Sequence, residues 1–294
     1  MNVTLDELLS HAPVVTDGAM GSELQARGLE SGECPDAWNL ARPAAVEELA
    51  RAYVEAGSEI ILTNTFRSNR LALEHTRLTD KVEELNLAGV EIARRAAAGR
   101  AHVFGCVGPS GKLLMIGETG EDELQRAFAE QIQTLATAGV EGLVIETMTD
   151  LDEAKLALAA ARATGLPVVA SMVFDTGKNK DRTMTGITPE QAAKDLTEAG
   201  ADVIGANCGY GIAGYISVCQ RLRASTPRPI WIKPNAGLPE MVDGKAVYKT
   251  TPEAFAGFIP ALLQAGASFV GGCCGTNPDF IRAVAETARR WRRR

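Results

Sequence analysis

The hydrophobic positions of the chain fall into short runs that follow helix-like segments, and this order returns along the sequence. Four stretches share one form, a helix-like segment that ends in Ala-Gly, a short link and an apolar run. They are "EAGSEIILTN" (55–64), "TAGVEGLVIE" (137–146), "EAGADVIGAN" (198–207) and "QAGASFVGGC" (264–273). Glycine suits a helix C-terminus, and near-continuous apolar runs suit parallel strands covered on both faces. The pattern therefore predicts repeated strand–helix units.

Eight such apolar runs are strand candidates. They are Val14–Thr16, Ile60–Asn64, Val103–Val107, Leu143–Thr147, Val168–Val173, Val203–Asn207, Ile230–Lys233 and Ser268–Gly271. Eight strand–helix units in a chain of this length predict an α/β fold, the (βα)8 TIM barrel. A doubly wound open sheet is the alternative. No low-complexity linker or shift in composition divides the chain, so we expect a single domain over residues 1–294.

Two of the predicted helices carry a clear start signal. "TPEQAAKDLTEAG" and "TPEAFAGFIPALLQAG" both open with Thr-Pro, a capping residue followed by proline at the first helical position. We expect one helix in each stretch.

Composition narrows the class of protein. The chain has 294 residues, of which 46% are hydrophobic and 23% charged, as in a soluble protein with a sizeable core. A net charge of −7 argues against nucleic acid as the main partner. Neither a signal peptide nor an apolar segment long enough for a membrane span is evident, so we expect a cytoplasmic protein without membrane contact. Its six cysteines are then reduced, which favours metal binding or catalysis over disulfides.

Three of these cysteines stand where a barrel carries its chemistry, at the C-terminal ends of strands. Cys208 follows the sixth predicted strand, and Cys273 and Cys274 follow the eighth. The sixth and eighth strands flank the seventh, so the three thiols can converge. Three cysteines without a fourth nearby ligand describe a zinc site with an open position. The alternative is that these thiols are merely packed or lie in loops.

The proposed donor set also indicates a type of reaction. Three thiolates on Zn²⁺ give a net charge of about −1, which makes the metal a poor Lewis acid for activating water. The same metal can hold an incoming thiol as a nucleophilic thiolate. The pattern therefore favours alkylation of a substrate sulfur over hydrolysis.

Several motifs together carry a resemblance to a known family. They are "TDGAMGSELQARG", "TNTF", "GPSGKLL", "IETMTDLDEAKLAL", "GANCGYG", "KPNAGLP" and "GGCCGT". From about Val14 to Ala288 the chain resembles the homocysteine S-methyltransferase family, and "GANCG" with "GGCCGT" is the most specific part.

The resemblance implies a (βα)8 barrel in which Cys208, Cys273 and Cys274 bind zinc and the zinc binds the sulfur of homocysteine. It further implies that Asp17, the Gly18 backbone and Glu146 hold the polar end of the amino acid. We add Asn207, beside the first cysteine, to the substrate site. Glu146 or solvent is expected to take the thiol proton.

The methyl donor is a separate question. "GPSGKLL", "IETMTDLDEAKLAL" and "KPNAGLP" are most similar to the homocysteine-binding module of cobalamin-dependent methionine synthase. The 294 residues show no folate barrel and no corrinoid module with its Asp-x-His-x-x-Gly signature. We therefore expect a methylcorrinoid delivered by a separate corrinoid protein or as free methylcobalamin. The alternatives are a small donor such as betaine or S-methylmethionine, and a thiol other than homocysteine as acceptor.

Two further hypotheses assign the chain a function other than that of a self-sufficient methyltransferase. Lys233, at the end of the seventh predicted strand, is placed as the Schiff-base lysine of an aldolase would be. Alternatively, the chain is a zinc-bearing subunit that has no turnover without a corrinoid-protein partner.

Overall fold

In the computed structural model of the chain, eight parallel strands stand in the order β1-β10-β7-β6-β5-β4-β3-β2. Thr16, just after β1, bridges to Ile60 at the start of β2, and this bridge closes the sheet into a barrel. The structure describes residues 3–30, 32–242 and 245–293. The barrel strands are β1 (Val14–Val15), β2 (Ile60–Leu62), β3 (His102–Val107), β4 (Gly142–Met148), β5 (Val168–Met172), β6 (Val203–Cys208), β7 (Ile230–Pro234) and β10 (Ala267–Val270).

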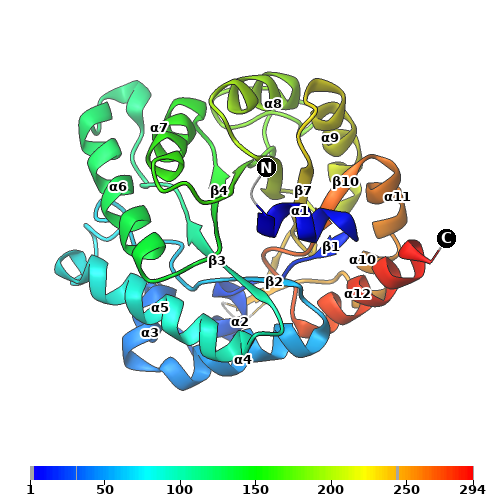
Figure 1. Cartoon of the computed structure of the whole chain (residues 1–294), viewed down its shortest axis with the longest axis horizontal. Helices are drawn as coiled ribbons and strands as arrows, with labels where there is room; N and C mark the ends of the chain where they lie inside the picture. The colour runs from blue at the N-terminus through cyan, green and yellow to red at the C-terminus, as the bar shows by residue number, and fades with distance from the viewer. Residues whose placement is uncertain (1–2, 31, 243–244, 294) are drawn as a thin grey trace.

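Helices form a ring outside the strands (Figure 1). The main ones are α4 (Pro43–Ala56), α5 (Val82–Ala97), α6 (Glu121–Thr137), α7 (Leu151–Arg162), α8 (Pro189–Glu198), α9 (Ile212–Ser225), α10 (Pro252–Ala256), α11 (Ile259–Gln264) and α12 (Pro278–Arg292). The (βα)8 barrel predicted from the apolar runs is confirmed. None of the described helices has the length and apolar character needed to cross a membrane.

Shorter elements lie at the N-terminus and in the loops. They are α1 (Val3–Ser10), α2 (Gly21–Ala26), α3 (Trp38–Ala41), the 3₁₀ helices η1 (Pro35–Ala37), η2 (Thr79–Lys81) and η3 (Leu114–Ile116), and the antiparallel pair β8 (Glu240–Val242) and β9 (Lys245–Val247). The pair β8–β9 belongs to the loop that follows β7, on the side of the barrel where the strands end.

The core has two parts because alternate residues of a strand point to opposite faces. One apolar cluster lies inside the barrel and includes Phe104, Trp231 and Phe269. Leu5 and Leu8 of α1 belong to this inner cluster. Figure 1 shows α1 lying across the ring of strands. Helix α1 thus fills the N-terminal opening of the barrel, while a larger cluster packs the outer face of the strands against the helices.

The stretch "TPEAFAGFIPALLQAG" differs from its predicted single helix. It forms two helices, α10 and α11, with Gly257 and Phe258 between them. Pro260 stands in the first turn of α11, where its missing N–H costs nothing, whereas a continuous helix would lose a hydrogen bond there. Both Thr-Pro starts are confirmed, because the Thr188 and Thr251 hydroxyls accept hydrogen bonds from backbone N–H groups three residues further on.

The pairing of β1 with β10 brings the two strands into close approach at their C-terminal ends. The Thr16 backbone N donates to Val270 O at 2.8 Å. A Cβ atom at Gly271 would lie 2.7 Å from Asp17 O and would also overlap Thr16 Oγ1. Glycine is therefore required at the point where the chain leaves β10 for the predicted metal ligands.

We expect Gly271→Ala to lower the free energy of unfolding by about 2 kcal/mol or more, because overpacking at a backbone contact forces the strands apart. Chemical denaturation measures this. The matched control is Gly214→Ala in the exposed first turn of α9, where an added Cβ meets nothing within 4 Å. This control should be neutral or slightly stabilising. Equal stability of the two variants would contradict the close approach.

Candidate functional site

Three cysteine side chains meet at the C-terminal rim of the barrel. Cys208 ends β6, and Cys273 and Cys274 lie in the loop after β10. Strand β7 stands between β6 and β10, so both segments reach the rim beside the end of β7. The three sulfur atoms lie within 4.8 Å of one another. Among the described residues, these three cysteines are the one group of histidine, cysteine, aspartate or glutamate side chains whose ligand atoms lie close enough to bind a single metal ion.

The backbone after β7 fixes this arrangement from between the two cysteine segments. Asn235 N donates to Cys208 O at 3.1 Å on one side. On the other side, Cys273 N donates to Pro234 O at 2.9 Å, and Ala236 N donates to Cys274 O at 2.9 Å. The positions of all three thiols therefore depend on one short segment, residues 234–236.

Cys208 has an unusual backbone conformation, with φ of +66° in the left-handed region. A non-glycine residue pays roughly 1–3 kcal/mol to stay in such a sparsely populated region, and such strain is concentrated at functional sites. Gly209, with φ of +70°, continues the turn without that cost. The turn ends β6 abruptly and brings the Cys208 sulfur toward Cys273 and Cys274.

The thiols share protons unequally. Hydrogen bonds from Cys273 and then Cys274 lower the pKa of Cys208, against the effect of burial. Their hydrogen bonds to Cys208 raise the pKa of Cys273 and Cys274. One thiolate held by two thiols is a donor set that a soft cation completes by displacing the remaining protons.

Asn207 organises the rim from inside the protein and is fully buried. Its Oδ1 accepts hydrogen bonds from Thr147 N at 2.8 Å and from the Ser171 hydroxyl at 2.7 Å. Its Nδ2 donates to Thr147 Oγ1 at 2.6 Å and lies 3.9 Å from Cys273 Sγ. The side chain thus ties the ends of β4, β5 and β6 together. Its assignment to substrate binding stays a prediction.

Below the thiols lies a layer of buried charged groups. Lys233 Nζ is 2.5 Å from Asp17 Oδ1, and Asp17 Oδ2 accepts a hydrogen bond from Leu62 N at 2.7 Å. Glu146 Oε1 accepts from the Cys106 thiol at 3.3 Å, whereas its Oε2 is buried without a partner among the described residues. Burial raises the pKa of Glu146, and Lys233 opposes that rise.

Lys233 does not have the character of a Schiff-base nucleophile. Burial alone would lower the pKa of its ammonium group, but Asp17 and Glu146 more than offset this and raise it above the usual value. A lysine nucleophile needs a lowered pKa so that its amine is free. The geometry therefore opposes the aldolase hypothesis.

The chemistry of the three thiols fits a zinc ion, and a further atom supports this fit. Asn235 Oδ1 is buried and has no hydrogen-bond partner among the described residues. Its amide nitrogen donates to Gly209 O at 2.8 Å, so the side chain is held beside the turn at Cys208. Zinc accepts sulfur together with oxygen or nitrogen ligands. The three thiols supply three sulfur ligands and leave the fourth position of a zinc ion open, and the unsatisfied Asn235 oxygen belongs to a side chain held beside the turn at Cys208.

The sequence-predicted residues fall into two connected groups. The structure brings Cys208, Cys273 and Cys274 together, and it places Asp17 and Glu146 in the charged layer beneath them. Burial raises the pKa of Glu146, and the negative charge of Asp17 adds to that rise. Gly18 lies against the Tyr53 ring, so that an added Cβ there would be only 2.7 Å from the ring.

Sequence reasoning assigned no role to Asn235 and missed the pairing of Lys233 with Asp17. A lysine inside the otherwise apolar strand "IWIKP" was the available signal, because a buried lysine needs a countercharge.

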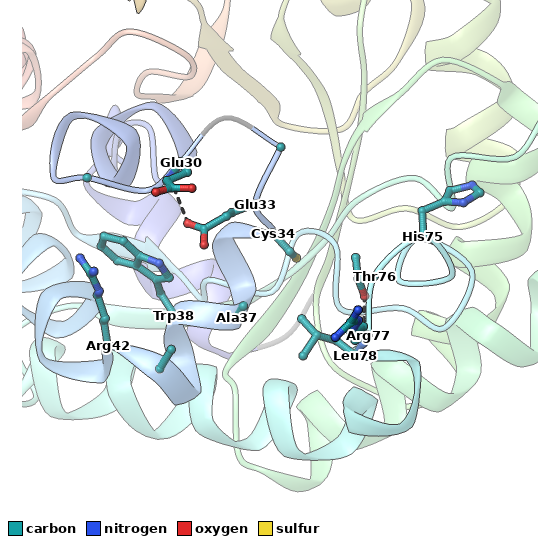
Figure 2. A pocket seen from close by; sticks show the side chains of 13 residues that line it. Glu30, Glu33, Cys34, Ala37, Trp38, Arg42, His75, Thr76, Arg77 and Leu78 are labelled. Carbon is teal, nitrogen blue, oxygen red and sulfur yellow. Dashed lines mark hydrogen bonds between the residues drawn. The ribbon is translucent and has the colours of Figure 1, made fainter.

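A separate hollow of about 670 Å³ lies between the loop around η1 and the loop before η2. Figure 2 shows Cys34 in its lining, with Arg42 beside the Trp38 ring and residues 75–78 opposite. Its lining contains none of the three clustered cysteines. Burial raises the pKa of Cys34 to about 11, so little of this thiol is present as the nucleophilic thiolate near neutral pH.

We expect iodoacetamide to label Cys208, the clustered cysteine whose pKa is lowered, in the native, metal-free protein well before the three cysteines outside the cluster. The latter are Cys34, Cys106 and Cys219, which are buried and whose pKa values burial raises. Because the thiolate is the reactive form, they should react slowly. Peptide mass spectrometry measures the order of labelling, and added Zn²⁺ should protect the cluster. Early labelling of Cys34, or no protection by Zn²⁺, would contradict the assignment.

Comparison with known proteins gives consistent matches over nearly the whole chain. Methionine synthase from Mycobacterium tuberculosis (strain ATCC 25618 / H37Rv) is 34% identical over 306 residues, which cover 95% of this chain and 25% of the relative. Methionine synthase from Mycobacterium leprae (strain TN) is 33% identical over 97% of this chain and 25% of its own length. The chain thus spans about a quarter of the length of these two relatives.

Betaine–homocysteine S-methyltransferase 1 from Danio rerio is 29% identical, over 96% of this chain and 74% of the relative. The metallated form of the homocysteine methyltransferase MmuM from Escherichia coli has the same fold, with a TM-score of 0.78 at 22% identity. That superposition covers 94% of this chain and 96% of the other. The family model for homocysteine S-methyltransferase matches residues 14–288. The chain belongs to the homocysteine S-methyltransferase family.

Proposed function

We propose that this protein methylates the sulfur of homocysteine to give methionine, using a zinc ion held by Cys208, Cys273 and Cys274 and a methylcorrinoid as methyl donor. The observation that carries the proposal is the convergence of three thiols, whose sulfur atoms lie within 4.8 Å of one another. The same end of the barrel contains a buried carboxylate, Glu146, with an unpaired oxygen. Family membership supports homocysteine as the acceptor.

The metal part of the proposal rests on the donor set. When bound to the three cysteines, zinc would lower the pKa of a substrate thiol and keep the resulting thiolate nucleophilic. The protein supplies the geometry through the segment 234–236 and the strained backbone at Cys208. Asn207 keeps the ends of three strands in register beside Cys273.

The polar end of homocysteine belongs in the charged layer. An ammonium group that leaves water needs a countercharge, and Glu146 Oε2 is a buried carboxylate oxygen with no other partner among the described residues. Binding the ammonium there holds the amino acid with its sulfur toward the cysteines. Because Glu146 is paired with the ammonium group, the substrate thiol proton passes to solvent.

Methyl transfer then follows from positioning. An electron pair of the substrate sulfur forms the new S–CH₃ bond, while the bond between the methyl group and its donor breaks and leaves its electron pair on the donor. Methionine is a neutral thioether, a weaker ligand than a thiolate, and it leaves the site.

The choice of a methylcorrinoid rests on similarity. The motifs "GPSGKLL" and "KPNAGLP" resemble the homocysteine-binding module of cobalamin-dependent methionine synthase. The two methionine synthases are also slightly more similar to this chain than the betaine-dependent relative is. A separate corrinoid protein would be the partner that presents the methyl group.

The direct test is methionine formation from homocysteine by zinc-loaded protein with five donors in separate reactions. These are methylcobalamin, methyltetrahydrofolate, S-methylmethionine, S-adenosylmethionine and glycine betaine. We expect turnover with methylcobalamin. Turnover with betaine or a sulfonium compound alone would replace the donor in the proposal. If all five fail while zinc is bound, a corrinoid-protein partner or another thiol acceptor must be sought.

We expect Cys208→Ser and Cys273→Ser to lose bound zinc and at least about 100-fold of the activity, because even changes around a metal's ligands cost 10–100-fold. Metal analysis, circular dichroism and the methylation assay measure this. Cys34→Ala is the matched control, a buried cysteine outside the cluster, and it should keep both zinc and activity. Full activity in either serine variant would disprove the ligand assignment.

A further inference from the structure

Lys233 is a positively charged group inside the barrel. It lies on β7, two residues after Trp231, which belongs to the apolar cluster inside the strands. The ammonium group is 5.9 Å from the centre of the Trp231 ring, and the side chain is only 3% exposed. A lysine in this position is costly unless a carboxylate accompanies it.

The accompanying carboxylate is Asp17, and both of its oxygen atoms have a partner within the protein. One oxygen of Asp17 faces Lys233 Nζ at 2.5 Å, and the other accepts the Leu62 backbone N–H at 2.7 Å. Asp17 therefore has a partner on each oxygen before any substrate enters. The family resemblance assigns Asp17 to the substrate's polar end, but here its charge is already balanced.

Glu146 is in the opposite situation. One oxygen accepts only a weak thiol hydrogen bond from Cys106, and the other has no partner among the described residues. The three charged groups, Asp17, Glu146 and Lys233, together carry a net charge of −1 when ionised. A single ammonium group placed at Glu146 would bring the layer to neutrality.

We propose that Lys233 is a positioning residue that sets how the substrate binds: by pairing with Asp17 it leaves Glu146 as the carboxylate that is free for the ammonium group of a thiol amino acid, among the described residues of this layer. This inference rests on the proposed function and deepens it. It makes Asp17 a partner of the protein's own lysine, and it makes the lysine part of the selection for substrates with one amino group.

The consequence of removing the lysine follows from simple electrostatics. In Lys233→Met, two buried carboxylates remain without a cation between them, and such a pair tends to retain one proton. The substrate ammonium must then displace that proton, so binding weakens. In Asp17→Asn/Lys233→Met, Glu146 again stands alone and the net charge of the layer returns to −1.

The test compares wild type, Lys233→Met, Lys233→Arg and Asp17→Asn/Lys233→Met in the zinc-loaded protein. Homocysteine binding is measured by calorimetry, and kcat and KM are measured separately. We expect Lys233→Met to raise KM and Kd by about tenfold or more, with kcat changed less. The double variant should recover most of that affinity. The homocysteine affinity of Lys233→Arg should lie between those of wild type and Lys233→Met.

A second substrate separates this role from direct contact with the substrate carboxylate. 3-Aminopropane-1-thiol has the amine and thiol of homocysteine but no carboxylate. We expect Lys233→Met to weaken its binding as well. If Lys233→Met weakens the binding of homocysteine but not of 3-aminopropane-1-thiol, and the double variant does not recover homocysteine binding, Lys233 binds the substrate carboxylate and the proposal is wrong. Unchanged KM in Lys233→Met would also overturn it.

The experiment distinguishes a failure of this proposal from a failure to fold and from a failure of the proposed function. If Lys233→Met does not fold, the double variant carries the test, because it does not leave two unpaired carboxylates in the layer, and weak homocysteine binding by a folded double variant would then refute the role. If wild type neither binds nor methylates homocysteine, the proposed function fails rather than the assignment of Lys233.

Discussion

The thiol cluster depends on the adjacency of β6, β7 and β10 in a closed parallel barrel. Parallel strands end on one rim, so residues far apart in the chain are brought together there. The segment 234–236 then bonds to Cys208 on one side and to Cys273 and Cys274 on the other. Without closure at Thr16 and Ile60, β1 and β2 would be edge strands of an open sheet. The strained turn at Cys208 persists because β6 is paired with β7 before the turn and the segment 234–236 bonds to the Cys208 carbonyl.

Along the barrel axis the polarity changes in ordered steps. Leu5 and Leu8 fill the N-terminal opening, and aromatic side chains including Trp231 occupy the interior above them. Lys233 and its carboxylates form the next layer, and the sulfur atoms stand at the rim. Charged groups are thus introduced only where they have partners, as the low polarisability of a protein interior requires. This order leaves Glu146 Oε2 buried without a hydrogen-bond partner among the described residues.

The fold was predictable because its signals are local. Apolar runs marked the eight strands, and two Thr-Pro pairs marked helix starts. The convergence of the cysteines was also predictable, because it follows from strand order once a barrel is assumed. The pairing of Lys233 with Asp17 was not, since the two residues are 216 positions apart and no spacing rule connects them. The internal bonding of Asn207 and the break between α10 and α11 likewise depend on tertiary contacts and on Pro260, which local patterns describe only in part.

The last turn of α12 meets the segment before β1 on the side away from the site. Arg292, in the last turn of α12, donates to Pro13 O at 3.1 Å and pairs with Glu59 at 2.6 Å, and His11, just after α1, contacts the same glutamate. Pro13 and Glu59 both immediately precede barrel strands, so these contacts lie at the N-terminal face. A purification tag or surface anchor attached at either end would therefore hold the barrel with its thiol rim directed outward. The protein is thus suited to oriented immobilisation on a sensor surface, with the thiol rim facing the solution.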